Sequence, residues 1–294
     1  MACGSRYGHA MDLGKVGVWW SGSWIAQADP SLDVAAELEA LGYGAVWSSG
    51  GFDQGLSSRF ERLLASTSHI PVASGIVSIW ASPPQEIAPA VAGLEAKQRG
   101  RFLLGLGASH ALIVENYSRP YERMVEYLDV LDVTEPSVPA RRRVLAALGP
   151  RMLALAASRA TGAHPYFVPV EHTARAREVL GAGPLLAPEV TVVLERDPTT
   201  ARRLARKFAS LYLTLPNYVQ NLRTLGYTDD DFAGDGSDRL IDSVVSWGDV
   251  DAIVARVREH HGAGADHVCI QVVSDEEGFP LSQYRELANG LLPD

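Results

Sequence analysis

Short apolar runs alternate with helical segments along this chain, and this alternation constrains the fold more than any other feature. Each run is predominantly hydrophobic, which is typical of a parallel strand that is buried on both faces. The runs are Val16–Trp20, Ala45–Trp47, Pro71–Val77, the middle of Arg99–His110, Val144–Leu148, His164–Val168, Val190–Leu194 and His267–Val273. They recur roughly every 25 to 35 residues, as right-handed crossover units do. Eight such units predict an α/β fold, a (β/α)8 TIM barrel with insertions, rather than an open sheet.

The segments outside these runs indicate the domain organisation. Residues 1–12 show no apolar periodicity, so we expect a disordered leader there. Thr134–Pro139 contains two prolines and could be a domain linker. Because the alternation resumes directly after it, we interpret it as an insertion and residues 13–294 as a single barrel domain. A further helix is expected over Leu240–Ser246.

The charge balance of the chain excludes some classes of partner. The formal net charge is −9 and the pI is about 5.4, whereas nucleic acids and anionic membranes require a basic face. The apolar runs are shorter than the roughly 20 residues of a membrane span. Cys3 and Cys269 are far apart and follow no secretory leader, which is expected of a reduced, cytoplasmic protein. The expected partner is therefore a small molecule.

In a barrel of this kind the functional residues follow the strands, at their carboxyl ends. The strand within Arg99–His110 ends in Gly105 and Gly107, which lack a Cβ and so let a backbone or a flat ligand come close. Ser109 and His110 bring polar groups to the same place. A dinucleotide fingerprint needs a third glycine where His110 stands, so a nicotinamide cofactor is disfavoured.

Two of these strand exits carry chemistry with more than one interpretation. Gly149, Pro150 and Arg151 open a helix directly after a strand, and the free amides there favour an anion or a phosphate. Ordinary helix capping gives the same pattern. His110 can donate or accept a proton, or it can simply hydrogen-bond a loop carbonyl.

The remaining aromatic and histidine residues are weaker candidates. The tryptophans at or near strand exits are Trp19, Trp20, Trp24, Trp47 and Trp80, which either belong to the core or wall a pocket for a flat ring. His164 begins a predicted strand and is expected at the opposite face of the barrel. No metal site is expected, because His172, His260, His261 and His267 lack the spacing of metal ligands. The signatures of serine hydrolases, Walker-type nucleotidases and zincins are absent.

Several of these motifs together resemble a known family. The segments Ala73–Val77, Gly100–His110, Leu148–Leu153 and Gly264–Val268 resemble, in order and spacing, the luciferase-like monooxygenase superfamily. The resemblance is to its branch that uses the deazaflavin coenzyme F420, and it covers nearly all of the chain from Val16 onward. It implies an α/β barrel with insertions, a homodimer, and hydride transfer between C5 of the deazaflavin and a substrate carbon.

The resemblance also implies which residues contact the coenzyme. In family members with this pattern a bulge in the third strand, often with a non-prolyl cis peptide, backs one face of the ring, and Gly75-Ile76 matches that position. The helix start at Gly149 resembles the region that holds the phosphate and lactyl tail. The full set of expected cofactor contacts is Ser49, Gly50, Ser74, Gly75, Ile76, Gly107, Ala108, Gly149, Pro150, Arg151, Gly162 and Ala163.

One departure from the family affects the expected catalytic residues. Better-known members carry an Asp-His pair after the second strand, where this chain has Ser48–Gly51. The catalytic Glu that some relatives have after the fourth strand falls at Ser109 and His110. By position, His110 then handles the proton, and Ser109 hydrogen-bonds the ring or the substrate. Two alternatives stay open: an FMN-dependent monooxygenase, or a catalytically inactive barrel used for binding.

Overall fold

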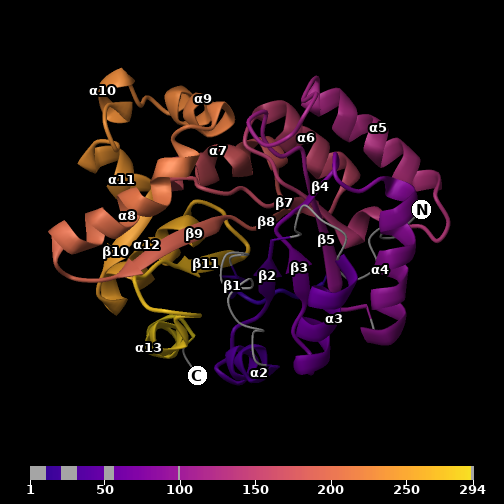
Figure 1. Cartoon of the computed structure of the whole chain (residues 1–294), viewed down its shortest axis with the longest axis horizontal. Helices are drawn as coiled ribbons and strands as arrows, with labels where there is room; N and C mark the ends of the chain where they lie inside the picture. The colour runs from indigo at the N-terminus through magenta and orange to yellow at the C-terminus, as the bar shows by residue number, and fades with distance from the viewer. Residues whose placement is uncertain (1–10, 21–31, 50–55, 99, 293–294) are drawn as a thin grey trace.

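The computed structural model describes residues 11–20, 32–49, 56–98 and 100–292. Its centre is an 11-stranded sheet in which every pairing is parallel (Figure 1). The strands are β1 (Val16–Trp20), β2 (Val46–Ser48), β3 (Val72–Ser74), β4 (Val77–Ser78), β5 (Phe102–Gly107), β6 (Arg143–Leu145), β7 (Gly162–Ala163), β8 (Leu185–Leu186), β9 (Glu189–Leu194), β10 (Val245–Gly248) and β11 (Val268–Val272). They pair in the order β10-β9-β11-β1-β2-β3-β5-β6-β7-β8, and β4 pairs with β5.

One strand closes the sheet, because β8 and β9 are parts of one strand interrupted at Ala187 and Pro188, whereas β10 stays outside this closure as an edge strand beside β9. The β8 part pairs with β7, and the backbone N–H of Ala187 donates to Ala163 O at 2.9 Å. The β9 part pairs with β11, and Cys269 N donates to Pro188 O at 3.0 Å. The sheet is thus closed, and the predicted (β/α)8 barrel is confirmed.

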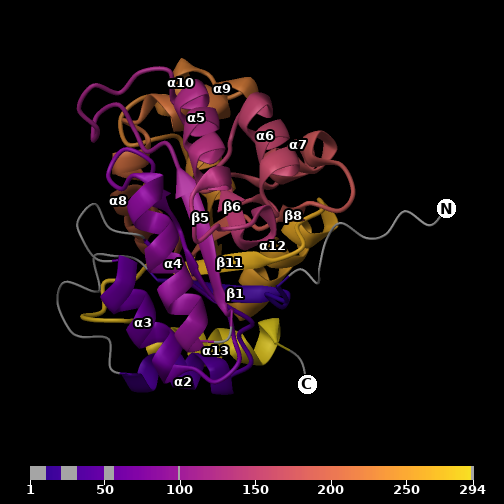
Figure 2. The ribbon, with the colours of Figure 1, turned by 90° about the vertical axis from the view of Figure 1, so that its right-hand side faces the viewer.

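Helices cover the outside of the barrel. They are α2 (Leu32–Ala40), α3 (Leu56–Ser66), α4 (Pro84–Gln98), α5 (Pro120–Val133), α6 (Pro150–Arg159), α7 (Val170–Leu180), α8 (Pro198–Tyr212), α9 (Pro216–Thr224), α10 (Asp229–Phe232), α11 (Asp238–Val244), α12 (Val250–Gly262) and α13 (Leu281–Leu291). Figure 2 shows α4 lying outside β5 with α5 beside it. Side chains fix several helix starts: those of Asp197, Ser237 and Asp249 accept backbone N–H groups of α8, α11 and α12.

Alternate side chains of β5 belong to two different hydrophobic cores. Phe102, Leu104 and Leu106 belong to the large core between the barrel and its helices, whereas Leu103 belongs to the core inside the barrel. Successive side chains of a strand point to opposite faces, so Gly105 and Gly107 face the barrel interior with Leu103. That interior core also contains Trp19, Trp47, Ala73 and Cys269.

Two predicted elements differ from the structure. The strand expected over His164–Val168 is instead the short β7, which ends at Ala163, because Pro165 has no N–H to donate to a ladder. The helix expected over Leu240–Ser246 ends at Val244, and the chain continues as β10, an edge strand that pairs only with β9. Partner strands far along the chain determine β10, and a local pattern does not reveal them.

The remaining expectations concern the leader and excluded functions. Residues 1–10 of the predicted leader lie outside the described residues, and Asp12 accepts the backbone N–H of Gly14 at 2.9 Å. Within the described ranges, no helix is both long and apolar enough to cross a membrane. Over the same ranges, no cluster of three or more His, Cys, Asp or Glu side chains is placed to hold a metal ion.

Candidate functional site

The carboxyl ends of four neighbouring strands bring together most of the predicted site residues. Register places Ser48 of β2 beside Ser74 of β3. The expected contacts that follow these strands are Ser49 after β2, Gly75 and Ile76 after β3, Ala108, Ser109 and His110 after β5, and Gly149, Pro150 and Arg151 after β6. Gly50 lies outside the described residues. The carbonyl oxygen of Ser49 accepts a hydrogen bond from Arg59 of α3 at 2.7 Å.

The third strand carries the bulge that the resemblance implies. The Gly75–Ile76 peptide bond is cis, and the strand resumes beyond it as β4. Gly75 N donates to Ser48 O at 2.7 Å, which ties the bulge to β2. The Ser74 hydroxyl accepts from Gly105 N at 2.8 Å and donates to Gly105 O at 3.0 Å, which ties it to β5. Gly75 itself stays partly exposed.

The two glycines of β5 accommodate this bulge. A Cβ at Gly105 would lie 1.8 Å from Ser74 O. A Cβ at Gly107 would lie 2.6 Å from the Cγ1 and Cδ1 atoms of Ile76. The sequence left open whether a backbone or a ligand approaches these glycines. In the structure, the backbone of Ser74 approaches Gly105 and the side chain of Ile76 approaches Gly107.

The loop after β5 holds the two predicted catalytic residues. Ser109 has a left-handed backbone with φ 57°. His110 is half-buried, and its Nδ1 lies 2.9 Å from Asn217 Oδ1 of α9. Because an amide oxygen only accepts, Nδ1 carries the proton and Nε2 has the free lone pair. Burial lowers the pKa of His110, and the bond to Asn217 partly opposes this shift.

The start of α6 follows β6, at the same end of the barrel. Gly149 is its N-cap and provides no side-chain cap, and Pro150 is the first helical residue. The guanidinium of Arg151 lies 4.0 Å over the ring of Tyr121 and 3.3 Å from Glu122 Oε1, so it is engaged with α5. The first amides of α6 therefore remain the groups at this helix start that suit an anion, and anion binding there stays a prediction.

Gly162 and Ala163 lie within the sheet rather than in a loop. They form β7, and both are buried. A Cβ at Gly162 would lie 1.9 Å from Leu185 O, so this glycine permits the close pairing of β7 and β8. The structure thus gives Gly162 a role in the sheet, and its expected contact with a cofactor stays a prediction.

The structure brings His164 into the site, where the sequence had not placed it. It directly follows β7, so the prediction that it lies at the opposite face was wrong. Its Nδ1 lies 2.7 Å from Ala187 O, and its ring stacks on Trp47 at 4.2 Å. Complete burial lowers the pKa of His164 to about 4. Pro165, directly after it, was the signal in the sequence that the strand had already ended.

Three of the five tryptophans belong to the cores, which is one of the two interpretations that the sequence allowed. Trp19 and Trp47 are buried inside the barrel, and Trp20 packs on Phe279 in the outer core. Trp80 is half-buried, and its indole N–H donates to Ala108 O at 2.7 Å, so it supports the loop after β5. Trp24 lies outside the described residues.

A buried polar group on β9 was not predicted. Glu189 is buried, and it accepts hydrogen bonds from the Thr191 hydroxyl at 2.6 Å and from Phe167 N at 3.3 Å. Burial raises the pKa of this carboxyl to about 8. Tyr166 donates to Gln271 Oε1 at 2.8 Å and lies 2.8 Å from the hydroxyl of Tyr212. Apart from the Glu189–Thr191 pair, these contacts join residues far apart in the sequence, so no local motif indicates them.

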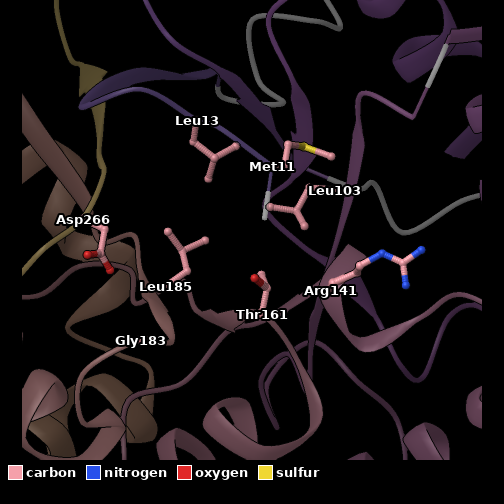
Figure 3. A pocket seen from close by; sticks show the side chains of 8 residues that line it. All are labelled: Met11, Leu13, Leu103, Arg141, Thr161, Gly183, Leu185 and Asp266. Carbon is pink, nitrogen blue, oxygen red and sulfur yellow. The ribbon is translucent and has the colours of Figure 1, made fainter. Parts of the chain in front are cut away.

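A pocket of about 200 Å³ lies at the amino ends of the strands, away from this site (Figure 3). Its position follows from its lining: Leu13 precedes β1, Thr161 precedes β7 and Asp266 precedes β11. The other lining residues are Met11, Leu103, Arg141, Gly183 and Leu185. Asp266 is already paired with Arg177 at 2.6 Å. The predicted site residues do not contribute to this pocket.

Comparisons with known proteins agree with this architecture. A coenzyme F420 dependent tetrahydromethanopterin reductase from Methanopyrus kandleri superposes with a TM-score of 0.72 and 16% identity, over 95% of this chain and 98% of that one. The FMN-bound oxygenating constituent of 3,6-diketocamphane monooxygenase from Pseudomonas putida gives a TM-score of 0.64 and 16% identity, over 97% and 99%. These likenesses show the fold.

Sequence comparison identifies the family. A protein of Mycobacterium tuberculosis named as a coenzyme F420-dependent oxidoreductase is 26% identical over 53% of this chain. The match takes in 46% of that protein, so the chain spans about half the length of this curated relative. The profile of the family described as luciferase-like monooxygenase matches residues 20–267. The chain therefore belongs to the luciferase-like monooxygenase family.

Proposed function

We propose that this protein is an oxidoreductase that binds coenzyme F420 at the carboxyl end of its barrel and uses it for hydride transfer to or from a small organic substrate. The observation that carries the proposal is the partly exposed backbone at Gly75 and Ile76, held between the ends of β2 and β5. Backbone without large side chains lets a planar ring come within contact distance. The names of the relatives support F420 as the ring system.

The polar atoms around Gly75 that lack hydrogen-bond partners indicate whether the site fits coenzyme F420. Trp19 Nε1, Ser48 Oγ and His164 Nε2 are buried and have no hydrogen-bond partner among the described residues. A buried polar atom without a partner is unfavourable in a folded protein. These atoms, together with the amides at the start of α6, suit a polar heterocycle that carries an anionic arm. The residues present therefore fit the coenzyme.

The chain's own residues would then bind, orient and handle protons. The coenzyme, when bound, supplies the hydride chemistry. Gly75 and Ile76 support one face of the ring, and the amides of α6 bind its phosphate. His110 offers the Nε2 lone pair as a proton acceptor from the substrate, since Asn217 occupies its other nitrogen. Ser109 offers a hydroxyl beside it.

An FMN-dependent monooxygenase is the second candidate. The FMN-bound enzyme that shares this fold supports it, and FMN also combines a planar ring with a phosphate. The features around Gly75 and α6 suit both molecules. A homodimer and a cytoplasmic location, which the resemblance and the composition implied, stay predictions.

Direct titration separates these candidates. Purified protein is titrated with oxidised F420 and, separately, with FMN, and ligand fluorescence is followed. We expect saturable binding of F420 that is tighter than binding of FMN. Tighter binding of FMN would favour the flavin monooxygenase. Binding of neither molecule would favour the catalytically inactive barrel and overturn the proposal.

A further inference from the structure

The pocket at the amino ends of the strands is separate from the proposed coenzyme site. Its volume is about 200 Å³, and none of the residues that carry the proposed function lines it. An apolar cavity of about 150 Å³ in a protein core is large enough to bind benzene. The pocket therefore has room for a ligand of roughly six to ten non-hydrogen atoms.

The inner wall of this pocket is apolar. Leu13 and Leu103 are buried and belong to the core inside the barrel, and Met11 and Leu185 pack against that core. Figure 3 shows the side chains of Leu13 and Leu185 directed toward one another. An apolar body that enters the pocket loses contact with water and packs on these side chains, which is favourable.

The outer part of the pocket carries polar groups. Arg141, Gly183 and Asp266 are exposed, whereas the inner leucines are not, so these three residues form the mouth. Thr161 also lines the pocket, and its backbone N–H and carbonyl are both hydrogen-bonded to neighbouring strands. The Thr161 hydroxyl has no hydrogen-bond partner among the described residues. It can therefore donate a hydrogen bond to a ligand.

One positive charge at the mouth has no carboxylate beside it. Asp266 Oδ2 lies 2.6 Å from the guanidinium of Arg177, so the charge of Asp266 is already balanced. Arg141 forms no ion pair or hydrogen bond with any residue that the structure describes. Its guanidinium extends outward from the pocket (Figure 3). The next two arginines of the chain, by contrast, are both paired with carboxylates. The mouth therefore favours a negatively charged group.

We propose that this pocket is a second binding site, for a small carboxylate with an apolar body. The apolar body lies against Leu13, Leu103 and Leu185. The carboxylate accepts hydrogen bonds from the Thr161 hydroxyl and from the guanidinium of Arg141, which stays protonated at every accessible pH. The proposal does not depend on the proposed function, because the two sites share no residue.

A series of straight-chain acids tests the apolar wall. Butanoate, pentanoate and hexanoate are titrated into the full-length protein and followed by calorimetry. We expect the Kd to fall about fourfold for each added CH2, the value of one buried methylene. No binding of hexanoate, or no dependence on chain length, would overturn the proposal.

Ligands of the same length test the charge at the mouth. 1-Hexanol and hexylammonium have the apolar body of hexanoate but carry no negative charge. Both should bind about tenfold more weakly than hexanoate, because hydrogen bonds to a charged group are stronger than neutral ones. Equal binding of all three would show a pocket that does not select carboxylates, and the proposal would fail.

Two conservative variants locate the carboxylate. Arg141→Gln removes the charge, and Thr161→Val removes the hydroxyl while keeping nearly the same shape. Each should raise the Kd of hexanoate by about three- to tenfold. Arg141→Gln should also reduce the preference for hexanoate over 1-hexanol, a difference that a general loss of stability would not produce.

Arg258 of α12 provides a matched control. It is exposed, it forms no ion pair or hydrogen bond within the described part of the chain, and it does not line the pocket. Arg258→Gln should leave the Kd of hexanoate unchanged. If Arg141→Gln and Thr161→Val also leave it unchanged, the acid binds elsewhere and the proposal is wrong. Titrations of FMN and F420 test the proposed function separately, and they should give the same result in Arg141→Gln as in the wild type.

Discussion

A hydrogen bond to one ring nitrogen holds His110 at the end of the barrel. Its Nδ1 bonds Asn217, and its ring lies 5.3 Å from that of Tyr218. If His110 handles the substrate proton, His110→Ala should lower kcat by about 100-fold or more, the usual contribution of a general base. The Kd of the coenzyme should change little, because the binding groups remain. Steady-state kinetics and fluorescence titration measure the two effects, and unchanged turnover would remove His110 from the reaction.

Substitution of Asn217 provides a second test of the role of His110. Its amide oxygen accepts the Nδ1 proton and so raises the pKa of His110, while burial lowers it. Asn217→Leu removes the raising influence, so the pKa of His110 should fall further. A base must be neutral, so the acid limb of the kcat profile should move to lower pH in this variant. A limb that stays in place would show that another group controls it.

Gly105 of β5 leaves room for the backbone of the third-strand bulge. Any side chain at Gly105 meets the backbone of Ser74, since its Cβ would lie 1.8 Å from Ser74 O. Gly105→Ala should therefore reduce the free energy of unfolding by roughly 1–3 kcal/mol and weaken coenzyme binding. Gly93 in α4 has no atom within 4 Å of its would-be Cβ, so Gly93→Ala should instead stabilise by roughly 0.5–1 kcal/mol. Denaturant titration measures both values.

Among the helices and strands, those whose formation depends on a local hydrophobic pattern could be predicted from the sequence. The buried strands β1, β5, β9 and β11 were visible as continuous apolar runs. The bounds of β7 could not be predicted in this way. Its two residues form a strand because they pair with β6 and β8, and their own composition does not indicate a strand. The edge strand β10 was assigned to a helix for the same reason.

At the scale of the whole barrel, the rule that functional residues follow the carboxyl ends of the strands predicted which loops form the site. It did not predict every side chain that these loops bring there. It placed Gly75, Ser109 and His110 correctly at one end. It missed His164, because the position of that residue depended on where β7 ends. It also missed Glu189, because contacts such as that with Phe167 cross between loops and strands far apart in the chain. Closure of the barrel creates these contacts, and periodicity carries no information about them.

Buried histidines make the whole molecule sensitive to acid. Burial lowers the pKa of His260 to about 3 and the pKa values of His164 and His267 to about 4. In the unfolded chain these groups take up protons near pH 6.5. The unfolded state therefore binds more protons below that pH, and the free energy of unfolding should fall as the pH is lowered from about 6.5 towards 4. Urea titrations across this range test this, and a flat profile would contradict it.

Glu189 should have the opposite effect on the alkaline side. Burial raises the pKa of its carboxyl from 4.5 to about 8, so the folded protein keeps it protonated while the unfolded chain ionises it. Its contribution to stability is complete below about pH 4.5 and is lost as the pH rises to about 8. The side chain introduced by Glu189→Gln cannot ionise, and its amide oxygen can still accept the hydrogen bond from the Thr191 hydroxyl. Between pH 6.5 and 8, above the range in which the histidines act, the free energy of unfolding should therefore decline less in Glu189→Gln than in the wild type. Equal declines would show that Glu189 is ionised in the folded protein.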